Sequence, residues 1–357
     1  MIARYSATLM VLYITTAMLG LGSSAAAQGS ATDTGEWMLP RTPDGHPDLQ
    51  GNWTNVTVTP IQRPPGQDRV LTPDQVAAIE GMRDQIVEAG STASDPDRAP
   101  PPTGGTNPVC LDGATTCYNY VYWDQGDRVA IYNGEQRSSL ITNPANGLFP
   151  PLTSAGAQQA AELLDVTVQL GDYDHPESRP LPERCIMSYG SNAGPPMLPN
   201  YGYNNNYTIV QTADHIMIMT EMVHDARIIR LGERVPLPEH IRPWMGDSWG
   251  HWEGDTLVIE TTNLPVAQLN KHSYIYPGGS EQMRVVERLT RVDERTINYE
   301  FTVTDPGTYT LPWGGEVPMK ALDDLIYEYA CHEGNYALGN VLSGARYQER
   351  LDAENQN

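Results

Sequence analysis

The segment from Glu221 to Arg227 carries the residue types that general acid–base catalysis uses. A histidine held by a carboxylate is the usual general base, because its pKa of about 6.5 lies near neutral pH. We therefore predict His224 and Asp225 as the catalytic pair, with Arg227 as a clamp for a substrate carboxylate or as an electrophile, and Glu221 as a substrate-binding residue.

An extended strand would point the side chains of His224 and Asp225 to opposite faces. The prediction therefore requires a β-bulge or a bend at this point, a device that re-aims side chains beside active sites. The alternative is a surface ion pair between Asp225 and Arg227 next to a half-exposed histidine.

A second histidine, His251, lies between Trp249 and Trp252. The following Glu253-Gly254-Asp255 is typical of a hairpin turn, so these two carboxylates need no other role. Aromatic walls beside a histidine suit a ring-shaped or sugar ligand, so we predict His251 as catalytic and both tryptophans as substrate-binding. For Trp252, packing in the core is the alternative.

A third histidine, His332, directly follows Cys331. A disulfide at Cys331 would hold His332 rigidly, which suits a catalytic acid, and Asn335 would then bind substrate. The alternative is a structural histidine that is hydrogen-bonded at the end of the sheet.

These three histidines also raise the question of a metal, since three imidazoles are a known zinc arrangement. The chain contains no His-x-His and no Cys-x-x-Cys spacing, so we favour a site without metal and keep zinc as the weaker alternative. It also lacks the Gly-x-Gly-x-x-Gly pattern of nucleotide cofactor sites and the Gly-x-Ser-x-Gly pattern of serine hydrolases. No cofactor is therefore expected.

The composition indicates the kind of partner. Asp and Glu number 44 against 22 Lys and Arg, which gives a formal net charge of −22 and argues against binding to nucleic acid or to anionic lipid. Tyr and Trp number 19 and 7 against 2 Phe, so most aromatic rings carry a hydrogen-bonding group. Such rings line pockets for small organic molecules, and we predict Tyr203 as one of them.

The N-terminus predicts export. Residues 1–27 combine Arg4, an apolar run and a small-residue end at Ala27, which is typical of a cleaved signal peptide. No later segment approaches about 18 uninterrupted apolar residues, so no membrane insertion is expected. The remaining four cysteines favour two disulfides, a local one between Cys110 and Cys117 and a long-range one between Cys185 and Cys331, in a periplasmic or secreted protein.

The elements that must position these residues are mainly β. Thr72 as N-cap and Pro73 predict a helix, residues 154–164 predict a second, and residues 337–354 predict a C-terminal one. Period-2 patterns and short turns predict an antiparallel meander that closes into a barrel or sandwich. Its expected strands are 207–211, 216–223, 226–231, 256–262, 284–292, 296–303 and 325–331. A hairpin is also expected across residues 125–127.

We accordingly expect four parts. They are the signal peptide 1–27, a loop-rich segment 28–206 that wraps the β body, the antiparallel β body 207–336, and the C-terminal helix and tail 337–357.

Several motifs together are similar to those of a widespread family of uncharacterised, secreted proteins of Gram-negative bacteria. They are Pro-Arg-Thr-Pro-Asp-Gly at 40–45, Gly-His-Trp-Glu-Gly-Asp at 250–255 and Tyr-Ala-Cys-His-Glu-Gly-Asn at 329–335. The resemblance covers nearly the whole mature chain. It implies export and a mainly antiparallel β body, and it leaves the chemistry to the residues themselves.

Two functions from different classes follow. The first is an exported enzyme of lyase, dehydratase or isomerase type, which performs acid–base chemistry on a small organic or glycosidic substrate. The second is a periplasmic binding or carrier protein whose barrel encloses a small molecule. A third reading, a structural protein of the cell envelope, would lack a pocket.

Overall fold

The computed structural model describes residues 37–91, 97, 124, 126–161, 173–179, 181–188, 194–199, 204–265 and 278–355. The chain divides into two compact units, Met1–Trp37 and Met38–Asn357, and the fold below is that of the second. The predicted signal peptide 1–27, the predicted bridge between Cys110 and Cys117, and Tyr203 lie outside the described residues.

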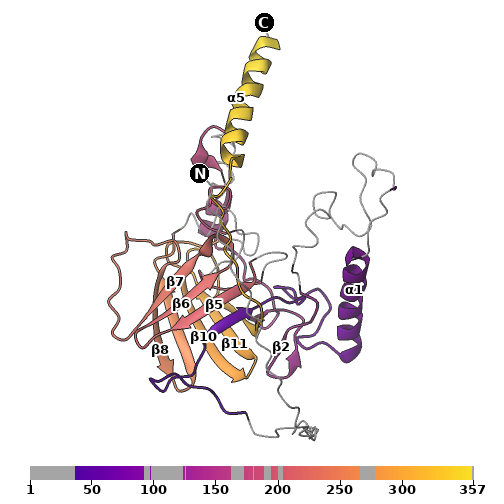
Figure 1. Cartoon of the computed structure of the whole chain (residues 1–357), viewed down its shortest axis with the longest axis vertical. Coiled ribbons are helices and arrows are strands. Elements are labelled where there is room, and N and C mark those ends of the chain that lie inside the picture. Colours follow the sequence, from indigo (N-terminus) through magenta and orange to yellow (C-terminus); the bar gives the residue numbers. More distant parts are fainter. Residues whose placement is uncertain are drawn as a thin grey trace, which may run out of the picture. The chain divides into compact units, whose positions relative to one another are not determined.

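The central element is a closed β-barrel of nine strands (Figure 1). The cycle runs β1-β5-β6-β7-β8-β9-β10-β11-β12, and pairing of β12 with β1 closes it. This confirms the predicted mainly β fold. The strands are β1 (Gly51–Thr54), β5 (Asn206–Gln211), β6 (His215–Thr220), β7 (Ala226–Leu231), β8 (Asp247–Glu253), β9 (Thr256–Thr262), β10 (Arg284–Asp293), β11 (Thr296–Thr304) and β12 (Trp313–Ala321).

One pair in the barrel departs from the antiparallel meander. β7 and β8 run parallel, with register from Ile229↔Ser248 to Leu231↔Gly250. Parallel neighbours cannot be joined by a tight turn, so residues 232–246 cross from the end of β7 back to the start of β8. We call residues 232–246 the crossover segment. Its prolines, which cannot donate to a strand ladder, keep it outside the sheet.

The N-terminal segment takes part in the sheet. It supplies β1 and also β4 (Ile141–Asn143), which pairs with β12. A separate hairpin joins β2 (Ile131–Tyr132) to β3 (Glu135–Gln136), and its turn at residues 133–134 comes later in the chain than the expected turn at 125–127. The expected strand 325–331 is wrong, because most of these residues have no regular structure and the last strand is β12.

The helices follow the predictions. α1 (Pro73–Ser91) begins with a reciprocal cap, since Thr72 Oγ1 accepts from Gln75 N–H at 3.3 Å and Gln75 Oε1 accepts from Thr72 N–H at 2.8 Å. Residues 154–161 are helical, and α5 (Ala337–Asn355) is the last element of the described residues. Among the described residues, none of the helices has the length and apolar character of a membrane span.

The barrel interior is filled by side chains. Alternate residues of its strands point inward and form one apolar cluster, which includes Ile218, Ile259, Val285, Tyr299 and Val317. Small barrels of this kind are packed cores, so a ligand site must be sought at the rim or on the outer surface.

Two charged side chains share this interior. Arg227 of β7 and Glu287 of β10 are 1% and 0% exposed, and the guanidinium donates to both carboxylate oxygens at 2.6 and 2.9 Å. Tyr299 OH donates to Glu287 Oε1 at 2.9 Å and accepts from Met197 N–H. Burial, with the nearby Glu287 charge, raises the pKa of Tyr299, so its phenol stays protonated. The guanidinium of Arg227 is therefore occupied by Glu287 and is not available to bind a substrate carboxylate.

The long-range disulfide is confirmed. Cys185 and Cys331 are bridged across 146 positions, and the bridge ties residues 181–188 to the segment after β12. Asn335 strengthens the same junction, because its side-chain amide donates to Glu183 O at 3.4 Å and lies 3.2 Å from Cys185 Sγ.

Removing one member of the buried ion pair Arg227–Glu287 should lower the free energy of unfolding. Glu287→Leu would leave Arg227 charged without a partner, and we expect a loss of about 3–5 kcal/mol in the free energy of unfolding by urea denaturation. The double variant Arg227→Met, Glu287→Leu should recover most of that loss. Asp323→Asn is the control, since it alters an exposed pair with Arg295, and exposed pairs contribute little to stability. Equal losses in Glu287→Leu and in this control would contradict the assignment.

Removing the disulfide should also weaken the fold. The double variant Cys185→Ser, Cys331→Ser frees a long loop in the unfolded chain, and we expect a loss of about 2–5 kcal/mol. Chemical denaturation of wild type and variant in the same non-reducing buffer measures it. Coincident denaturation midpoints would refute the expectation.

Candidate functional site

The three predicted catalytic histidines lie in different elements of the fold. His224 ends η3 (Met222–His224), the 3₁₀ turn between β6 and β7. His251 lies on β8 with its side chain 61% exposed, 3.2 Å from Glu253 Oε1. His332 is exposed beside the disulfide. Of the three, only His224 lines the pocket described next.

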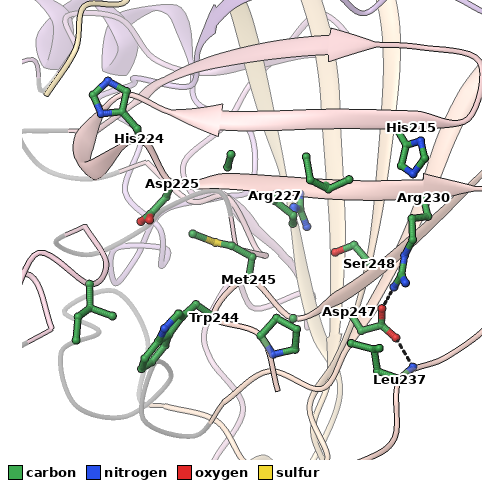
Figure 2. Close-up of a pocket in the computed structure, with 15 residues that line it drawn as sticks. His215, His224, Asp225, Arg227, Arg230, Leu237, Trp244, Met245, Asp247 and Ser248 are labelled. Carbon is green, nitrogen blue, oxygen red and sulfur yellow. Dashed lines mark hydrogen bonds and ion pairs between the residues drawn. The ribbon is translucent and has the colours of Figure 1, made fainter. Parts of the chain in front are cut away.

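This pocket has a volume of about 570 Å³ and lies between β7, the start of β8 and the crossover segment (Figure 2). β7 pairs with β8 only from Ile229 onward, so its first half has the pocket as its neighbour on that side. Outward-facing Ile228 is 51% exposed there, while inward-facing Ile229 is buried. The remaining wall comes from the crossover segment, chiefly Leu237, Trp244 and Met245.

A backbone bend brings His224 and Asp225 to one end of this pocket. Val223 and His224 have φ of 64° and 55°, the left-handed region that side chains with a Cβ rarely adopt. Thr220 N–H donates to Asp225 O at 3.0 Å and closes the turn. The bend that the sequence required is therefore present, one residue earlier than expected. Strain of this kind persists where the surrounding structure fixes it, often at functional sites.

Glu221 and Asn335, predicted to bind substrate, make hydrogen bonds to other parts of the protein. Glu221 Oε2 accepts from Asn206 Nδ2 at 3.2 Å, so the side chain ties the turn to β5. Asn335 lies at the disulfide junction described above. Neither residue lines the pocket.

Asp225 is a pocket-lining carboxylate whose pKa is perturbed by its surroundings. Burial raises its pKa to about 6, although a hydrogen bond from Ser188 N–H to Oδ2 at 3.2 Å and the nearby His224 oppose the rise. Within the described residues, Oδ1 has no hydrogen-bond partner. A carboxylate that is partly deprived of water and has one open oxygen is a suitable proton acceptor.

His224 has a defined hydrogen-bonding role. Its Nε2 accepts from Tyr329 N–H at 3.2 Å, in the segment that leads to Cys331. An acceptor at Nε2 places the proton of the neutral ring on Nδ1, so the ring can donate from Nδ1. The segment around His332 thus supports His224 instead of supplying its own imidazole to the pocket.

The other charged groups that line the pocket are paired. Asp247 binds Arg230 and also accepts from Leu237 N–H at 2.9 Å, so one carboxylate fastens the crossover segment to the barrel (Figure 2). His215 lies 2.9 Å from Asp214, and Arg227 is held by Glu287. Among the described residues that line the pocket, Asp225 therefore differs from Asp247 in having no arginine partner.

The two tryptophans predicted to bind substrate pack against other side chains. Trp249 lies under the guanidinium of Arg230, whose Cζ is 4.2 Å from the ring centroid. Trp252 stacks on His46, with centroids 4.9 Å apart and an interplanar angle of 5°. The packing alternative for Trp252 therefore holds, and the aromatic wall of the pocket is Trp244, which the sequence analysis missed. The signal was a large aromatic residue next to a proline in a loop-like segment.

Among the described residues, no group of three or more His, Cys, Asp or Glu side chains is arranged to hold a metal ion. Beside the paired groups, the pocket offers the carboxylate of Asp225, the imidazole of His224 and an apolar wall. This set can bind a small organic molecule and accept or donate a proton.

The raised pKa of Asp225 has a measurable consequence for stability. In the unfolded chain this carboxyl has a pKa of about 3.9, so between about pH 4 and 6 the folded protein holds a proton that the unfolded chain has lost. Asp225 thus costs stability as pH rises through this window. Asp225→Asn should be more stable than wild type by about 1–2 kcal/mol at pH 7.5, after allowance for its partial exposure, and equal to it near pH 4.

Urea denaturation at both pH values measures this difference. Asp323→Asn is the matched control, because that exposed carboxylate has its pKa lowered by Arg295 and its loss should bring no gain at pH 7.5. A wild type that is as stable as Asp225→Asn at pH 7.5 would contradict the assignment.

Comparisons with known proteins do not assign the chain to a family. No family model, no curated protein and no solved structure matches the chain. The function of the site is therefore argued from its own residues.

Proposed function

We propose that the chain is an exported enzyme that transfers a proton to or from a small organic substrate bound between β7 and the crossover segment. The observation that carries the proposal is Asp225, a partly buried carboxylate with a pKa of about 6 and an open Oδ1 at the end of a pocket. The reaction class is lyase, dehydratase or isomerase, and no nucleotide cofactor takes part.

Asp225 and His224 have different roles in the proposed reaction. At neutral pH most Asp225 side chains are ionised, and their raised pKa makes them stronger bases than an ordinary carboxylate. His224 can donate from Nδ1 to an oxygen on which charge develops, because Nε2 is already held by Tyr329 N–H. A base and a donor on adjacent residues serve removal of a proton next to a carbonyl or a leaving hydroxyl.

Export is part of the proposal. It is supported by the signal-like residues 1–27, by the resemblance to secreted proteins of Gram-negative bacteria, and by the disulfide Cys185–Cys331, since such bonds persist in oxidising compartments. We propose the periplasm or the exterior as its location.

A binding or carrier protein is the second candidate. It is favoured by the apolar share of the lining, which includes Ile228, Leu237, Trp244 and Met245. Native mass spectrometry separates the two candidates, because a carrier would retain an unaltered ligand.

The proposed activity can be tested without knowing the substrate. Wild type is incubated with a cell extract of small molecules in D₂O, because proton transfer to carbon incorporates deuterium that mass spectrometry detects. Wild type should label at least one compound, and Asp225→Asn should lower the labelling rate by about 10²-fold or more, the usual share of a general base. Asp323→Asn should label at the wild-type rate. Labelling by Asp225→Asn at the wild-type rate would refute the proposed role.

A further inference from the structure

We propose that this pocket selects an organic cation, whose positively charged nitrogen lies between the carboxylate of Asp225 and the indole of Trp244. The inference rests on the proposed function, because it assigns the substrate class of the same pocket. It follows from the charges and the aromatic surface that face the pocket.

The charge balance of the pocket leaves one place for a cation. Arg227 is neutralised by Glu287, Arg230 by Asp247, and His215 is paired with Asp214. Among the described lining residues, Asp225 is the carboxylate without an arginine partner. His224 is the titratable side chain whose charge acts on it, and Ser188 supplies a backbone N–H.

A carboxylate in this position is stabilised best by a cation brought by the ligand. Burial without compensation is the largest influence on Asp225, and it opposes the charged form. A ligand cation would supply the missing partner, whereas a ligand anion would add repulsion. The net charge of −22 on the whole chain acts in the same direction by attracting cations to the surface.

The second half of the site is aromatic and polarisable. Trp244 is 41% exposed, so part of its ring is open to a ligand. Figure 2 shows Trp244 and Asp225 at the same side of the pocket, with Met245 between them. An indole face attracts alkylammonium groups more strongly than other side-chain rings do, and a thioether adapts its shape to a ligand.

The same cation would help the proposed chemistry. When an N–H bond of a cationic substrate breaks, or a C–H bond next to its iminium carbon, the proton moves to Asp225 Oδ1 and the electron pair stays on the substrate, where it cancels the positive charge. Two charged groups thereby become two neutral ones. The burial of Asp225 favours this change, because it opposes the charged form of the carboxyl.

Binding of a defined probe to the full-length mature protein tests the inference. The probes are benzyltrimethylammonium, neutral benzyl alcohol and anionic benzenesulfonate, and titrations at pH 7.5 follow the tryptophan indole signals by NMR. The cation should bind at least about tenfold more tightly than either of the others, and its affinity should fall as pH drops below about 6, where Asp225 becomes protonated.

Matched variants locate the site. Asp225→Asn should weaken binding of the cation by about tenfold or more, and Asp323→Asn should leave it unchanged. Trp244→Leu should weaken it about three- to tenfold, Trp244→Phe should retain part of the affinity, and Tyr347→Leu on α5 should have no effect. Circular dichroism melts confirm that each variant is folded.

The outcomes separate this inference from the proposed enzyme. Equal affinity for the cation and benzyl alcohol, or an unchanged affinity in Asp225→Asn, overturns the cation site even if deuterium labelling depends on Asp225. Asp225-dependent binding of the cation without any labelling by wild type supports the cation site and overturns the enzyme in favour of the carrier.

Discussion

The pocket depends on a single departure from antiparallel pairing, the parallel alignment of β7 with β8. An antiparallel neighbour would have followed a tight turn and continued along the whole of β7. Instead the chain must return to the start of β7 before β8 can begin, and the returning residues 232–246 form the outer wall of the pocket. The hollow is thus a result of strand order, and the side chains within it come from both partners of the parallel pair.

Ion pairs fix the position of β7 on both of its faces, which matters because its pairing with β8 is short. On the inner face Arg227 reaches across the interior to Glu287 of β10. On the outer face Arg230 binds Asp247, and the same carboxylate holds Leu237 of the crossover segment. Buried pairs add little stability over apolar residues, but they define register, because each partner is costly to leave alone. We interpret both pairs as devices that fix where β7 lies.

The sequence analysis identified strands whose neighbours follow directly in the chain. β9, β10 and β11 are rich in β-branched residues, and clear turns precede β9 and join β10 to β11, so their bounds were predicted within a residue or two. β12 was missed because Gly314, Gly315 and Pro318 resemble loop residues. In the structure, a side chain at Gly315 would meet the backbone carbonyl of Leu140, so the glycine permits the approach of β4.

Only part of the candidate site could be predicted from the sequence. The bend at His224 and Asp225 followed from a local conflict between residue types and strand alternation, and such conflicts are visible in a sequence. The partner of Arg227 was not visible, because Glu287 lies 60 positions away and closure of the barrel brings it near. Trp244 was missed for a similar reason, since it lines the pocket only because β7 and β8 are parallel and the crossover segment returns beside them.

The disulfide has a consequence for how the site is held together. Ser188, which donates to Asp225, lies three residues after Cys185, and Tyr329, which donates to His224, lies two residues before Cys331. One covalent link therefore draws together the two backbone donors of adjacent polar side chains. Loss of this one bond would therefore loosen the support of both side chains of the candidate site together.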